Sequence, residues 1–284
     1  MSGNELGLFL RSRRESVTPV QVGLPTGARR RTPGLRRSEL ATLAGVSVEY
    51  LTRLEQGRDR RPSAAVLATL ADALRLGTAE RMHLHRLTKE ADPGFRCRGD
   101  VAPSSDVRPT VRALLDRLEP TPAVVLNRRT DILAWTEGYR RLMAPAGLDP
   151  TDAANLTRFV FTEPRARAFY PDWSHVADET VARLKQGPFR NDPHIAAFAD
   201  ELTLTAGAEF ADRAESVPSL APTSGITRLA HPDAGPLRLS YEVLELAADD
   251  DAQLLVQLPA DEASAAALDR LAGLRSGALR AVSG

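Results

Sequence analysis

Residues 5–92 repeat apolar side chains at the spacing of amphipathic helices. Leu6, Phe9 and Leu10 fall on one helical face, and Arg13 lies largely opposite them. Ser63 stands directly before another apolar stripe, where a helix N-cap is expected. The predicted helices cover residues 5–15, 38–44, 47–56, 63–74 and 78–91. The pattern therefore predicts an all-α bundle of five helices, with a long loop over residues 18–34.

The second half of the chain changes to a mixed pattern. Apolar runs at 124–126 and 132–135 flank the polar "NRRTD" and predict a hairpin that leads into a helix at Glu137. Alternating residues predict three more strands, at 225–231, 236–246 and 252–260, joined as an antiparallel meander. Helices are predicted at 110–118, 171–186, 192–204 and in the final Ala-rich stretch. This half is thus predicted to be an α+β domain with an antiparallel sheet.

Length and composition agree with two folded domains. The chain has 284 residues, of which 43% are hydrophobic and 26% charged, as in ordinary globular proteins. Turn formers predict a linker at 93–106, between domains at 1–92 and 107–275. The single cysteine, Cys97, permits no internal disulfide, and no long apolar run predicts a membrane span or a signal peptide. We therefore expect a multidomain cytoplasmic protein that does not contact a membrane.

The net charge of zero conceals an asymmetry between the halves. Residues 1–100 hold 18 basic and 11 acidic side chains, so residues 101–284 hold 19 basic and 26 acidic ones. A basic N-terminal half is the candidate for a polyanionic partner such as DNA. The alternative is that two domains differ in charge by chance.

The basic charge gathers around "RRSELATLAGVSVEYLTRLEQGR", residues 36–58. Gly45 accepts the left-handed backbone that a sharp turn between two helices needs, and the small Ala41 and Ala44 let the helices approach. Leu51 and Leu54 supply the shared core. This spacing is typical of a DNA-binding helix-turn-helix, and the alternative is a helical bundle that binds protein.

Through "SELATLAGVSVEYLTRLEQGR" and "PSAAVLATLADAL" the stretch resembles the XRE family of repressors, which have the lambda-repressor-like fold. The resemblance implies that the second helix of the motif faces the major groove of an operator in double-stranded DNA, and that Arg37 contacts a phosphate. An independent argument from chemistry is that Arg53 can reach a guanine edge, whereas Glu49 can accept from cytosine. Glu55 is expected to form a salt bridge rather than a base contact. The predicted DNA-binding residues are Arg37, Ser47, Val48, Glu49, Tyr50, Arg53 and Arg58.

The loop over residues 18–34 is longer than the connection usual in that family and carries Arg29, Arg30 and Arg31. Adjacent arginines on a tether suit the narrow minor groove or its phosphates. The alternative is a solvated basic loop.

The second half resembles one subgroup, the MmyB-like transcription regulators, through "PAVVLNRRTDILAWT", "PDW", "HPDAG" and "LSYEVLEL" in that order. The resemblance implies a PAS-like fold, in which helices on one side of a sheet enclose a pocket. It also implies a small-molecule effector of apolar or fatty-acid-like chemistry. The sequence departs from the subgroup's pattern at Thr136, where asparagine is expected after "LAW".

The aromatic residues concentrate in this half and are the candidates for a ligand pocket, although each could instead belong to the core. Arg228 and His231 could meet an anionic head group, and the alternative for Arg228 is a surface ion pair. The predicted ligand-binding residues are Trp135, Tyr139, Phe159, Phe161, Trp173, Arg228, His231 and Tyr241.

Catalysis is not expected, because the sequence has no nucleophile motif, phosphate-binding loop or metal-ligand spacing. No cofactor is predicted. Homodimerisation is expected because a single helix-turn-helix covers too few base pairs to be selective. The alternative function is a DNA-binding scaffold or antitoxin-like protein whose C-terminal domain only dimerises or binds a protein partner.

Overall fold

The computed structural model describes residues 5–25, 32–59, 61–90, 102–152, 154–186, 192–218, 220–246, 252–273 and 279–282. These residues form two compact units, one helical and one α+β. Arg29, Arg30, Arg31 and Cys97 lie outside the described residues, as does most of the predicted linker.

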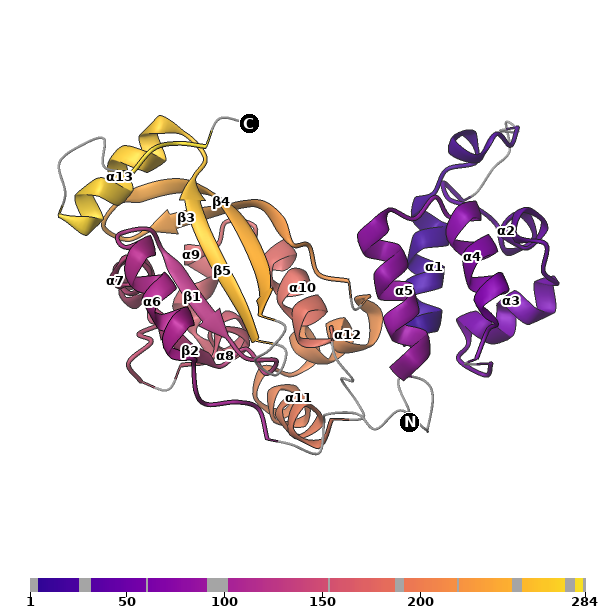
Figure 1. Cartoon of the computed structure of the whole chain (residues 1–284), viewed down its shortest axis with the longest axis horizontal. Helices are drawn as coiled ribbons and strands as arrows, with labels where there is room; N and C mark the ends of the chain where they lie inside the picture. Colours follow the sequence, from indigo (N-terminus) through magenta and orange to yellow (C-terminus); the bar gives the residue numbers. More distant parts are fainter. Residues whose placement is uncertain are drawn as a thin grey trace. The chain divides into compact units, whose positions relative to one another are not determined.

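In the described residues the helical domain has the five α-helices that the periodicity predicts (Figure 1). They are α1 (Glu5–Ser16), α2 (Arg37–Ala44), α3 (Val48–Glu55), α4 (Ala64–Ala73) and α5 (Thr78–Glu90). Phe9, Leu40, Leu51 and Leu70 are fully buried and join α1, α2, α3 and α4 in one apolar core. The Ser63 hydroxyl accepts a hydrogen bond from the backbone N–H of Val66, which confirms the predicted cap of α4.

The turn between α2 and α3 has the geometry that the sequence indicates. Gly45 has φ 66°, in the left-handed region, and its N–H donates to the carbonyls of Ala41 and Thr42 at the end of α2. Ser47 then begins α3, and its hydroxyl accepts from the N–H of Tyr50 at 3.1 Å. The turn therefore fixes the orientation of α3 relative to α2.

The α+β domain is built on one antiparallel five-stranded sheet of order β2-β1-β5-β4-β3. The strands are β1 (Ala123–Leu126), β2 (Ile132–Trp135), β3 (Ser224–His231), β4 (Gly235–Leu246) and β5 (Ala252–Pro259). The helices are α6 (Pro109–Leu118), α7 (Glu137–Met143), α8 (Leu156–Thr162), α9 (Pro164–Phe169), α10 (Trp173–Leu184), α11 (Pro193–Ala206), α12 (Ala208–Ser216) and α13 (Glu262–Ala272), with the 3-10 helix η3 (Ala144–Ala146) after α7.

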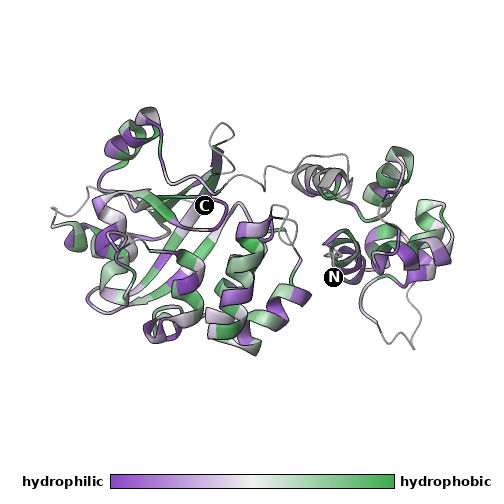
Figure 2. Ribbon diagram, turned by 90° about the horizontal axis from the view of Figure 1, so that it is seen from below, coloured by the Kyte–Doolittle hydropathy of each residue, from purple (hydrophilic) through white to green (hydrophobic). Residues whose placement is uncertain are grey.

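The two faces of the sheet are covered differently. The inner face, with Val124, Leu237 and Leu239, packs against α7, α8, α9, α10 and α13 in the main core of the domain. The outer face meets α6 over β1, β2 and β5, where Val125 and Leu254 are buried. Figure 2 shows the hydrophobic and hydrophilic stripes that alternate along these helices. The inner face is consequently the one that can enclose a ligand.

The predicted hairpin and meander are both present, but pairing of β1 with β5 joins them into one sheet, which the local patterns did not indicate. Helices α8, α9 and α12 were not predicted. Thr136, which departs from the subgroup's pattern, caps α7: its hydroxyl accepts from the N–H of Tyr139 and donates to the Thr121 carbonyl. Thr136 thereby ties the hairpin to the helix that covers the sheet.

Candidate DNA-binding surface and ligand cavity

A buried ionic cluster holds the helix-turn-helix together. The Arg14 guanidinium of α1 donates to both carboxylate oxygens of Glu55, at 2.7 and 3.2 Å, and to the Leu35 carbonyl at 2.9 Å. Arg37, at the start of α2, donates from Nε to the same carboxylate at 2.7 Å. Burial lowers the pKa of the Arg14 guanidinium. The hydrogen bonds to Glu55 and the charge of Glu55 together have a larger effect, so the pKa is raised. Glu55 therefore makes the expected salt bridge, between helices, and joins α3 to α1 and α2.

One face of α3 is exposed to solvent. Val48 is 40% exposed although it is apolar, and Glu49 and Arg53 are also exposed. The Arg53 guanidinium lies over the ring of half-buried Tyr50, 5.7 Å from its centroid. Because Ser47 accepts the N–H of Tyr50, its hydroxyl proton remains available to a phosphate. Polar and apolar groups that can contact base edges thus share one helix face.

Apart from Arg53, the predicted basic residues divide into three groups. Arg37 is fixed by Glu55, yet 43% of its side chain remains exposed. Arg58 follows the end of α3 and is exposed, whereas Arg29–Arg31 lie outside the described residues. Arg36 was not among the predicted residues: it is exposed at the N-terminus of α2, where its N–H donates to Glu39 at 2.7 Å. The adjacent arginines of "RRSEL" were the signal that could have found it.

The α+β domain contains a cavity of about 60 Å³ between the inner face of the sheet and helices α7, α8 and α10. Its lining combines apolar side chains with polar ones, and we call the polar lining residues its polar side. The lining residues are Tyr139, Met143, Leu156, Val160, Tyr170, Val176, Glu179, Thr180, Arg183, Thr227, Tyr241, Leu255 and Gln257.

Charged and hydrogen-bonding groups form the polar side of the cavity. The Tyr241 hydroxyl donates to Glu179 at 3.0 Å, and burial together with that carboxylate raises the pKa of Tyr241. Gly225, opposite Tyr241 in the β3–β4 register, leaves room for this ring, since an added Cβ would lie 2.9 Å from the hydroxyl oxygen. Burial lowers the pKa of Arg183, which donates to Gln253 at 3.0 Å. These groups can recognise a polar or anionic end of a ligand.

Gln257 adds an unsatisfied group to the same polar side. The residue is 8% exposed, and among the described residues no donor reaches its Oε1. A ligand or water with a hydrogen-bond donor would satisfy this acceptor.

Of the predicted ligand-binding residues, Tyr139 and Tyr241 line the cavity. Trp135, Phe159, Phe161 and Trp173 pack in or against the surrounding core instead. The Trp173 indole donates to the Val160 carbonyl at 2.9 Å, and Phe161 meets the Trp173 ring edge-on. These rings pack against one another in the core, so they do not line the cavity.

The two predicted head-group residues also lie away from the cavity lining. Arg228 makes two hydrogen bonds of 2.5 Å to Asp172, which is the surface ion pair given as the alternative. His231 is buried, and its Nδ1 accepts from the N–H groups of Asp233 and Ala234. The sequence reasoning missed Glu179 and Arg183, whose i, i+4 spacing on α10 resembles an ordinary surface pair.

A helix-turn-helix domain followed by an α+β domain with a partly open cavity is typical of DNA-binding regulators that carry a ligand-binding domain. The family model of the MmyB-like transcription regulator ligand binding domain matches residues 107–271. The chain belongs to this family. A helix-turn-helix domain model matches residues 5–84. A search of curated proteins found no match.

The two matches make the chain a transcription regulator with a DNA-binding domain and a ligand-sensing domain. In the described part of the chain, no helix has the length and apolar character needed to cross a membrane.

Proposed function

We propose that the chain is a homodimeric regulator that binds an operator through α3, with an affinity set by a small molecule in its C-terminal domain. The observation that carries this proposal is the exposed face of α3, where Val48, Glu49 and Arg53 project from a helix whose other face is buried. A recognition helix in the major groove needs this arrangement.

Each group on that face has a matching chemistry on DNA. Arg53 presents a two-pronged donor for O6 and N7 of guanine, and its contact with Tyr50 restricts where the guanidinium can point. Glu49 can accept from the cytosine amino group, and Val48 can pack on a thymine methyl. Ser47 and the N-terminus of α3 are placed for a phosphate, as is Arg37. Arg58 and the arginine triplet 29–31 add phosphate or minor-groove contacts in this proposal.

For the effector we propose an amphipathic molecule, apolar or fatty-acid-like along its length, in a PAS-like domain. The strand order and the helices on the inner face support that fold. The cavity of about 60 Å³ is smaller than the roughly 300–1,000 Å³ of typical ligand sites. An extended apolar chain must therefore displace core rings such as Phe159, Phe161 and Trp173. Binding would then be coupled to a change in packing.

Two measurements test this function. Selection of genomic fragments with the full chain should enrich one inverted repeat, with half-sites about one helical turn apart. Mass spectrometry of organic extracts of the purified protein should identify the bound molecule. Failure to enrich any sequence would contradict DNA recognition. A specific operator without any bound or stabilising small molecule would instead favour the scaffold function of the C-terminal domain.

A further inference from the structure

The outer face of the sheet is only partly covered. Register places Ile226, Ser240 and Leu258 side by side in one row across β3, β4 and β5, and all three belong to this face. Helix α6 covers the neighbouring part over β1, β2 and β5. Ile226 remains 52% exposed and Leu244, further along β4, 47% exposed. The open sheet face is our name for Ile226, Arg238, Ser240, Glu242, Leu244 and Leu258. Ser240 and Leu258 are half-buried, and the other four are exposed.

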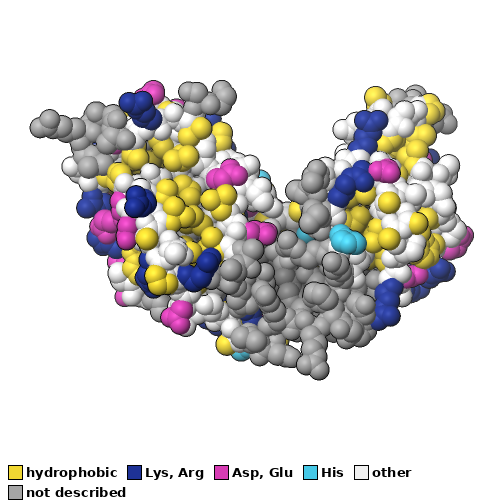
Figure 3. Space-filling model, in the orientation of Figure 1, with side chains coloured by type: hydrophobic (Ala, Val, Ile, Leu, Met, Phe, Trp, Pro, Cys, Tyr) yellow, Lys and Arg dark blue, Asp and Glu magenta, His cyan; other side chains and the backbone are white. Residues whose placement is uncertain are grey.

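Hydrophobic side chains gather over β4 and β5 in the space-filling view, with charged side chains at the rim (Figure 3). Exposed apolar side chains that share one sheet face indicate an interaction surface. The charges of this surface indicate which partner it fits.

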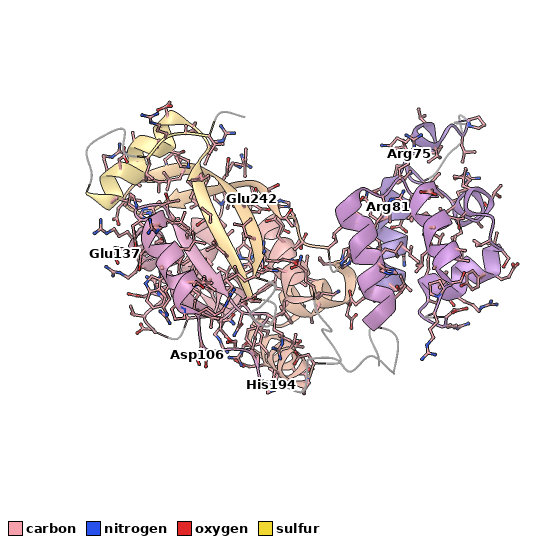
Figure 4. The ribbon with its side chains drawn as sticks, viewed as in Figure 1. Arg75, Arg81, Asp106, Glu137, His194 and Glu242 are labelled. Carbon is pink, nitrogen blue, oxygen red and sulfur yellow. The ribbon has the colours of Figure 1, made fainter. Side chains whose placement is uncertain are left out.

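Arg238 and Glu242 stand on β4 at equal distances from Ser240, two residues to either side. Figure 4 labels Glu242 on this strand. Arg238 makes one long contact to Asp261, at 3.4 Å, and within the described residues Glu242 has no recorded ion pair. The strand therefore presents opposite charges, about 13 Å apart, around a small polar centre. A surface with this symmetry is complementary to itself.

We propose that the open sheet face binds a second copy of the chain, with the two β4 strands antiparallel. The two-fold axis runs along the row Ile226–Ser240–Leu258, so Arg238 of each copy lies opposite Glu242 of the other. Sheets that pack face to face are about 10 Å apart, which Arg and Glu side chains can bridge together. This proposal rests on the homodimer of the proposed function and gives its interface a location.

The charges also select this orientation over the parallel one. A two-fold axis along the strands would place Arg238 opposite Arg238 of the other copy, and Glu242 opposite Glu242. Like charges opposed across an interface are costly. In the antiparallel arrangement, by contrast, two ion pairs flank the row Ile226–Ser240–Leu258.

The test is a charge exchange in the full chain, followed by sedimentation equilibrium. Arg238→Glu and Glu242→Arg should each weaken dimerisation roughly tenfold or more, because each variant places like charges opposite one another twice. The double variant R238E/E242R should return the dissociation constant to within about threefold of the starting protein. Arg270→Glu reverses the charge of an exposed residue on α13 and should leave the dissociation constant of the dimer unchanged.

A second measurement does not depend on charge. In a Cys97→Ser background, Ser240→Cys should be joined to its own copy by a bis-maleimide linker of about 10 Å, the spacing of packed sheets, and a cysteine at Arg270 should not. If the starting protein is a monomer, the proposed homodimer itself is wrong. If it is a dimer that neither the exchange nor the crosslink affects, the dimer stands and this interface is wrong.

Discussion

Arg53 is the side chain with the most direct predicted role in reading DNA. Its guanidinium is exposed, and the Tyr50 ring lies beneath it at 5.7 Å. Arg53→Ala should cost roughly 1–3 kcal/mol at one base position of the operator and relax the preference there. Arg37→Ala should weaken binding to all DNA sequences alike, because a phosphate contact carries no sequence information. Binding measured to operators substituted at each position distinguishes the two patterns, and equal losses on every sequence would contradict the role of Arg53.

Glu55 supports that surface without facing DNA. Glu55→Gln should destabilise the helical domain by about 3 kcal/mol, because Arg14 would remain buried beside a neutral partner. The matched control is Glu15→Gln, whose side chain is 52% exposed and whose loss should cost well under 1 kcal/mol. Urea unfolding of both variants provides the measurement. Equal stability of the two variants would show that the ionic cluster contributes little.

Among elements, the turn between α2 and α3 depends on the backbone of a single residue. Gly45→Ala should destabilise the domain by about 1 kcal/mol, because alanine disfavours the left-handed backbone and no atom lies within 4 Å of the added Cβ. Gly77→Ala is the control, since its backbone is not left-handed and its nearest contact is 3.7 Å away. Equal shifts of the thermal unfolding midpoint in the two variants would show that the turn tolerates a side chain.

Local patterns predicted those elements whose periodicity spans many residues. The strand at 236–246 alternates from Leu237 to Val243, and the β4 range was predicted to within one residue. Helices α8 and α9 have only 7 and 6 residues and meet at Glu163 and Pro164, which obscures any period. The Arg14–Glu55 pair joins residues 41 positions apart, a distance over which a single sequence carries no pattern.

The two sites differ in how far the sequence could predict them. The proposed DNA-binding face lies on one helix that follows a recognisable turn, so the turn and the resemblance to the XRE family together grouped Ser47, Glu49 and Arg53. The cavity instead forms where α10 meets β4 and β5, and its polar side comes from Glu179 and Gln257. Aromatic content pointed to the correct domain. It did not distinguish rings that pack against one another from rings that face a cavity.

For the whole molecule, the central claim is that occupancy of the cavity changes operator affinity. The effector must prefer one DNA-binding state, and a coupling of about 1–3 kcal/mol changes affinity roughly 5- to 150-fold. The same coupling acts in reverse, so operator DNA must change effector affinity by the same factor. Val176→Phe, which adds bulk to the cavity wall, should reduce effector binding and hence the coupling.

The most direct test is titration of the enriched operator with the full chain, stripped of any bound molecule and then saturated with the molecule identified in its extract. We predict that the operator dissociation constant differs between the two by at least about fivefold, and that Val176→Phe removes most of that difference. Identical operator affinity with and without the bound molecule would contradict the account.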